Sequence, residues 1–90
     1  MTVMKKIIKL EKLPTVSADG DSPVSFMRVT YTIWFGMRHV VRDIVSVGAN
    51  VFWYYADTGD RIGNDTAINA FATINATTWV VNKNITLDEQ

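Results

Sequence analysis

The chain has no cysteine, a single histidine at His39, and no excess of charge, with nine basic and nine acidic residues. Without cysteine it can build neither a disulfide framework nor a thiolate metal site. The zero balance gives no overall attraction for nucleic acid or for an anionic membrane, so we expect neither as a partner.

Long apolar runs are also missing from the sequence. No stretch approaches the roughly 18 apolar residues of a membrane span, and no apolar region of signal-peptide length follows the opening Met-Thr-Val-Met-Lys-Lys. We therefore expect a protein that is made and kept in the cytoplasm of the producing cell.

The composition is that of a small globular domain, with 48% hydrophobic and 20% charged residues in 10.1 kDa. We predict a single domain over 1–90. Within it, 1–23 is an N-terminal strand and loop that would also suit an extended arm, 24–87 is the core, and 88–90 is a polar tail.

The strongest secondary-structure signal is a strand over 25–35. Its residues alternate between a mostly apolar face and a mostly polar face, which is typical of a strand with one buried side. The apolar face holds Met27, Val29, Tyr31, Ile33 and Phe35, and the other face holds Phe26, Arg28, Thr30, Thr32 and Trp34.

Two segments fit either a strand or a helix. For 3–13 we favour a strand that ends before Pro14. For 37–47 the alternatives stay open: a helix would put His39, Arg42, Asp43 and Ser46 on its wetter face, whereas a strand would align Val41, Val45 and Val47 with Asp43 between them.

The remaining segments follow from local signals. We predict a loop over 14–23, a strand over 51–56, a turn over 57–60, a helix over 64–75 capped by the Asp65 side chain, and a strand over 77–81 that continues toward residue 87. The order indicates an α+β fold in which one or two helices pack on a small antiparallel sheet or sandwich.

The tripeptide Asp57-Thr58-Gly59 matches the one with which aspartic proteases present a catalytic carboxylate. A short chain could use it only as a retropepsin-like dimer, because that chemistry needs two carboxylates sharing a proton. A polar turn explains the same residues, since Asp57 suits the first turn position and Gly59 tolerates positive φ. We therefore expect a non-enzymatic protein with no catalytic residues, no metal site and no cofactor.

Aromatic residues are the most informative feature of the sequence. Four of them are consecutive, so a strand there must point rings to both of its faces. Rings that the chain itself does not cover would form a protein interface, and rings that it covers would be core. Our candidate interface residues are Phe26, Trp34, Phe52, Trp53, Tyr54 and Tyr55.

The order of these features resembles that of small structural proteins of tailed bacteriophage virions. The resemblance rests on the strand from Phe26 to Phe35 with Trp34 near its end, Tyr55-Ala56-Asp57 after the aromatic stretch, Asn64-Asp65-Thr66-Ala67 at the start of an Ala-rich helix, and Thr77-Thr78-Trp79-Val80-Val81. It implies a protein that works by repeated contact with copies of itself or with other virion proteins.

We accordingly predict a structural or assembly protein, a minor capsid or tail component located in the virion, that forms a homo-oligomer or another multi-copy assembly. One alternative is a small inhibitory module that binds a host protein through the same aromatic residues. The other is the dimeric protease.

Overall fold

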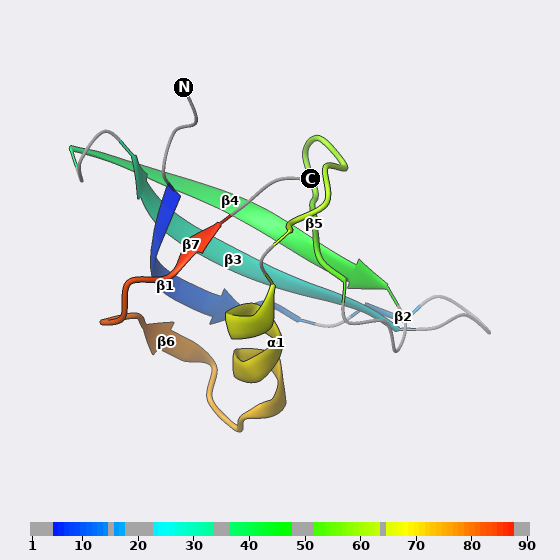
Figure 1. Ribbon diagram of the computed structural model, residues 1–90. Helices are drawn as coiled ribbons and strands as arrows, with labels where there is room; N and C mark the ends of the chain where they lie inside the picture. Colours follow the sequence, from blue (N-terminus) through cyan, green and yellow to red (C-terminus); the bar gives the residue numbers. More distant parts are fainter. Residues whose placement is uncertain are drawn as a thin grey trace.

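Antiparallel strands dominate the computed structural model, which describes residues 5–14, 16–17, 23–33, 37–47, 52–63 and 65–87. In chain order the elements are β1 (Lys5–Lys12), β2 (Val16–Ser17), β3 (Pro23–Ile33), β4 (Arg38–Val47), β5 (Tyr54–Tyr55), α1 (Thr66–Thr73), β6 (Thr78–Val80) and β7 (Thr86–Leu87). All the strands belong to one sheet, with α1 on one side of it (Figure 1).

The sheet is built around the hairpin of β3 and β4. These strands pair without a register shift from Val24 opposite Val47 to Ile33 opposite Arg38. On its other side β3 pairs with β1, with a bulge between Ile7 and Lys9. The order across the sheet is β5-β4-β3-β1-β6, while β2 pairs with the start of β3 and β7 with the start of β1.

The hydrophobic core lies on the side of the sheet that faces α1. We call this side the inner face; the strands contribute alternate residues to it, because side chains point to opposite faces along a strand. Among the described residues, the buried apolar ones are Ile7, Leu10, Met27, Val29, Tyr31, Ile44, Trp53, Tyr55, Ile62, Ile68, Phe71, Val81 and Leu87.

Helix α1 contributes Ile68 and Phe71 to this core. Its C-terminal end is tied to β1, because the Lys12 ammonium donates a hydrogen bond to the Ile74 carbonyl and lies 5.0 Å from the centre of the Phe71 ring. The shortest dimension of the molecule is 18 Å, which corresponds to two layers, a sheet and a helix.

The two ambiguous segments are both strands. The 3–13 prediction is confirmed over Lys5–Lys12. The 37–47 segment forms β4 because its pairing with β3 satisfies the backbone groups of Arg38–Val47 that point toward β3, and because the strand buries Ile44 and Ser46. The helical spacing of its apolar residues is therefore incidental.

Three local predictions need correction. The predicted loop over 14–23 contains strand β2, which can form because Val16 pairs with Val24. The strand expected over 51–56 is reduced to Tyr54–Tyr55, and Val51 lies outside the described residues. Asp65 occupies the N-cap position of α1, but its side chain makes no capping hydrogen bond, and the helix is shorter than predicted.

The fold class is thus a small antiparallel sheet with one described helix, more strongly β than the α+β class that we expected. The strands form a single sheet and no second sheet packs on it, so among the described residues the sandwich alternative does not apply. No described helix is long and apolar enough to cross a membrane.

The assignment of β4 predicts a contrast between two of its residues. Ile44→Ala should lower the free energy of unfolding by about 2–5 kcal/mol, because Ile44 is fully buried. Val41→Ala, on the opposite face and 57% exposed, should change it by no more than about 0.5 kcal/mol. Urea denaturation followed by circular dichroism measures both, and equal costs would contradict the assignment of faces.

Candidate interaction surface

The aromatic residues 52–55 alternate between core and surface. Trp53 and Tyr55 are buried, Tyr54 is half-buried, and Phe52 is exposed. The alternation confirms that the segment points rings to both sides. The chain itself covers two of these four rings, which the sequence had left open.

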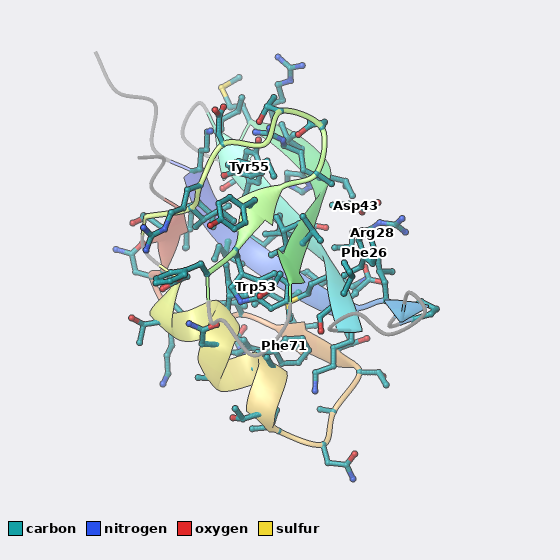
Figure 2. All side chains as sticks on the ribbon, turned by 90° about the vertical axis from the view of Figure 1, so that its right-hand side faces the viewer. Phe26, Arg28, Asp43, Trp53, Tyr55 and Phe71 are labelled. Carbon is teal, nitrogen blue, oxygen red and sulfur yellow. The ribbon has the colours of Figure 1, made fainter. Side chains whose placement is uncertain are left out.

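The two buried rings are held by specific contacts inside the chain. The Trp53 indole Nε1 donates a 2.7 Å hydrogen bond to Asn69 Oδ1 on α1, which satisfies its one polar group. The Tyr55 ring packs beneath the Arg42 guanidinium, whose central carbon is 3.6 Å from the ring centre. Figure 2 shows both rings on the inner side of the sheet.

The other candidate aromatics lie in different places. Phe52 is 40% exposed, and the Arg61 guanidinium stacks 4.0 Å from the centre of its ring. Phe26 is half-buried on β3, on the side of the sheet away from α1 (Figure 2). Trp34 lies outside the described residues. The six residues therefore do not form one aromatic patch in the described structure.

The side of the sheet away from α1, which we call the outer face, is the larger candidate surface. Register pairs place residues in rows across the strands, because directly paired residues point to the same face. One row is Val41, Thr30, Lys9 and Val80, and the next is Asp43, Arg28, Glu11 and Thr78. No described helix or strand packs over these rows.

Charged groups at the centre of the outer face are paired with one another. Arg28 Nε donates a 2.9 Å hydrogen bond to Asp43 Oδ1, and Lys9 Nζ lies 3.2 Å from Glu11 Oε1. The hydrogen bond and charge of Asp43, with a smaller contribution from Glu11, raise the pKa of Arg28. The charges of these two cations and two carboxylates therefore neutralise one another within the outer face.

Apolar side chains lie around this neutral centre. Val41 is 57% exposed on β4, and Val80 is 64% exposed on β6. Phe26 and Val45 are paired across β3 and β4 and are half-buried. A flat face with internally paired charges and exposed apolar groups can be covered by another protein without leaving a charge unpaired.

The turn after β5 borders this face at the edge of β4. Gly59 has φ +79, so the predicted need for glycine is confirmed. Its amide donates to the Tyr55 carbonyl at 2.8 Å, so the turn covers 56–58 and not 57–60, and Asp57 is not its first residue. The Arg42 guanidinium donates a 2.8 Å hydrogen bond to Asp57 Oδ1. A hollow of about 540 Å³ lies at this edge, lined by Arg28, Val41, Arg42, Asp43, Ala56 and Asp57.

The pairing of Arg42 with Asp57 fixes the charge state of both groups. The hydrogen bond from Arg42 lowers the pKa of Asp57, so this carboxylate is ionised at neutral pH. Burial alone would lower the Arg42 pKa, but hydrogen bonds to Asp57 and Tyr31 raise it on balance. A guanidinium partner does not favour the shared proton on which an aspartic protease pair depends.

Sequence reasoning missed most of the outer face, because the register that aligns Val41, Arg28 and Val80 depends on pairing between distant segments. The available signal was the strand alternative for 37–47, which aligned Val41 and Val45 with Asp43. Comparisons with known proteins add no further residues: no protein-family model, no curated protein and no solved structure matches the chain.

The contact between Trp53 and Asn69 predicts a measurable cost. Asn69→Ala leaves the buried indole N–H without this acceptor and should lower the free energy of unfolding by about 1–3 kcal/mol, with a shift of the indole proton resonance in NMR spectra. Asn75→Ala, at an exposed position just beyond the helix, is the matched control. An unshifted indole resonance in Asn69→Ala would contradict the contact.

Asp57 predicts a pH-dependent stability. Its folded pKa is lowered from the ordinary value of 3.8, so its contribution is fully present above that pH and is lost as the pH falls through the folded pKa. Asp57→Asn should therefore lower the melting temperature at pH 7, and the difference from the original chain should vanish in strong acid. A difference that stays constant with pH would refute the ion pair.

Proposed function

We propose that the chain is a non-enzymatic structural or assembly protein that acts through contacts between protein chains made at the outer face of its sheet. The observation that carries the proposal is that this face, with Val41 and Val80 exposed, has no described element packed on it. The shortest dimension of 18 Å corresponds to the two described layers, and another chain can supply a third layer over the sheet.

The paired charges support the same proposal. A solvated sheet face needs only polar residues, whereas this face combines the Arg28–Asp43 and Lys9–Glu11 pairs with exposed valines. Because the whole chain has no net charge, copies of it or of a neutral partner can approach without long-range repulsion. Repeated contacts of this kind are what a multi-copy assembly requires.

The class of assembly that we propose is the virion of a tailed bacteriophage, in which the chain would be a minor capsid or tail component. The order of the strand over 26–35, the aromatic segment, the helix and the strand over 77–81 supports this class. The chain would then be made in the host cytoplasm and end in the particle.

Quantitative mass spectrometry of purified particles tests this proposal. We expect several copies of the chain in each particle. Val80→Lys should reduce this number by introducing an unpaired charge into the contact, whereas Met37→Lys, at an 87% exposed position in the turn before β4, should leave it unchanged.

Two results would contradict the proposal. One is the absence of the chain from particles together with a stable one-to-one complex with a host protein, which would support the inhibitory module instead. The other is an equal copy number for Val80→Lys and for the original chain, which would remove the outer face from the contact.

A further inference from the structure

On the side away from β3, part of strand β4 has no described strand beside it. Strand β5 pairs only with Ile44 and Val45, and the last backbone contact on this side is the 3.0 Å hydrogen bond from the Ala56 amide to the Asp43 carbonyl. No described strand pairs with 38–42 on this side, which is the longest such stretch in the described sheet (Figure 1).

The backbone groups along this edge are oriented for pairing. Successive residues of a strand direct their N–H and C=O groups to alternate sides. Because the Asp43 carbonyl points toward β5 and away from β3, the groups of Val41 and His39 point the same way. These two residues therefore present two donors and two acceptors along the free edge.

The usual protections of a sheet edge are mostly missing here. Edges are commonly blocked by proline, by a bulge, by short length or by charged side chains. The described part of β4 has no proline, pairs with β3 without a register shift, and extends over Arg38–Val47. Charged residues are the one protection that the described part of β4 has. The basic residues lie at one end of the edge and the carboxylates at the other.

The asymmetry makes the edge complementary to itself. Arg38 and His39, both exposed, begin the free stretch, and the carboxylates of Asp43 and Asp57 lie at its other end, beside the 540 Å³ hollow. The Asp57 side chain is 61% exposed, whereas its partner Arg42 is only 14% exposed. An antiparallel second copy reverses this order and brings its Arg38 to the Asp57 carboxylate, the more exposed member of the Arg42–Asp57 pair.

We propose that two copies of the chain join through their β4 edges as antiparallel strands, in the register that places His39 opposite Val41 of the partner subunit. The inference rests on the proposed function, because it names a second copy as one of the chains contacted. The two sheets become one continuous sheet across a two-fold axis.

This register has definite consequences for side chains. His39 and Val41 of the partner subunit exchange both backbone hydrogen bonds, and Val40 lies directly opposite Val40 of the partner subunit in a pair without hydrogen bonds. Arg38 then lies opposite Arg42 of the partner subunit, and the exposed carboxylate of Asp57 of the partner subunit, which already accepts a hydrogen bond from that Arg42, can accept a second one from Arg38. This carboxylate offsets the repulsion between the two guanidinium groups, so the pairing depends on it.

A single cysteine tests the register, because the chain has no cysteine of its own. Opposed residues in a pair without hydrogen bonds have Cα atoms about 4.5 Å apart, which a disulfide can bridge. Val40→Cys should therefore form a covalent dimer under mild oxidation, seen as a doubling of the 10.1 kDa mass on a non-reducing gel. Ala72→Cys, exposed on α1, should remain monomeric under the same conditions.

Further substitutions show whether the disulfide forms through paired β4 edges or through random encounters between chains. Adding Val41→Pro to Val40→Cys removes the edge N–H without removing a bond to β3 and should abolish the dimer, whereas adding Val41→Thr should preserve it. Adding Asp57→Asn should weaken the dimer, because Arg38 then meets Arg42 of the partner subunit without a carboxylate beside them, and it gives a second test if the proline variant fails to fold by circular dichroism.

The inference is overturned if Val40→Cys crosslinks no more than Ala72→Cys, or if a folded Val41→Pro or Asp57→Asn variant crosslinks as fully as its parent. Either result would leave the proposed function standing if Val80→Lys still lowers the copy number in particles. If the dimer forms as predicted but Val80→Lys does not change the copy number in particles, edge pairing is supported and the outer-face contact is refuted.

Discussion

The pairing of β3 with β4 is the interaction on which the rest of the structure depends. It positions Met27, Val29 and Ile44 on one face, where α1 and the residues around Trp53 cover them. The same register positions Arg28 beside Asp43 on the other face. Because a shift by one residue would exchange the two faces, the core and the candidate surface are fixed together.

Features of the fold that depend on neighbouring residues in the sequence could be predicted from it. The alternation over 25–35 correctly assigned the buried and outer sides of β3, and Gly59 correctly marked a turn. The segment over 37–47 could not be assigned, because its valines and Ile44 satisfy helical spacing and strand content equally. Its pairing with β3, a contact between segments, decided the question.

The aromatic segment shows the same limit in another form. The sequence requires rings on both sides of residues 52–55, but what covers Trp53 and Tyr55 depends on where Asn69 and Arg42 are placed by α1 and β4. The described part of the outer face, by contrast, has few aromatic residues, so it was hard to anticipate. Its character comes from valines and ion pairs that are far apart along the chain and adjacent only in the sheet.

The most specific contact that we propose is that of a second copy of the chain with the open edge of β4. Amide hydrogen exchange at increasing protein concentration tests that claim most directly, because it reports protection residue by residue. We predict that the amides of His39 and Val41 exchange rapidly in dilute solution and become protected as concentration rises, while core amides such as that of Ile44 do not change. Exchange at His39 and Val41 that is independent of concentration up to the solubility limit would contradict the pairing of β4 edges.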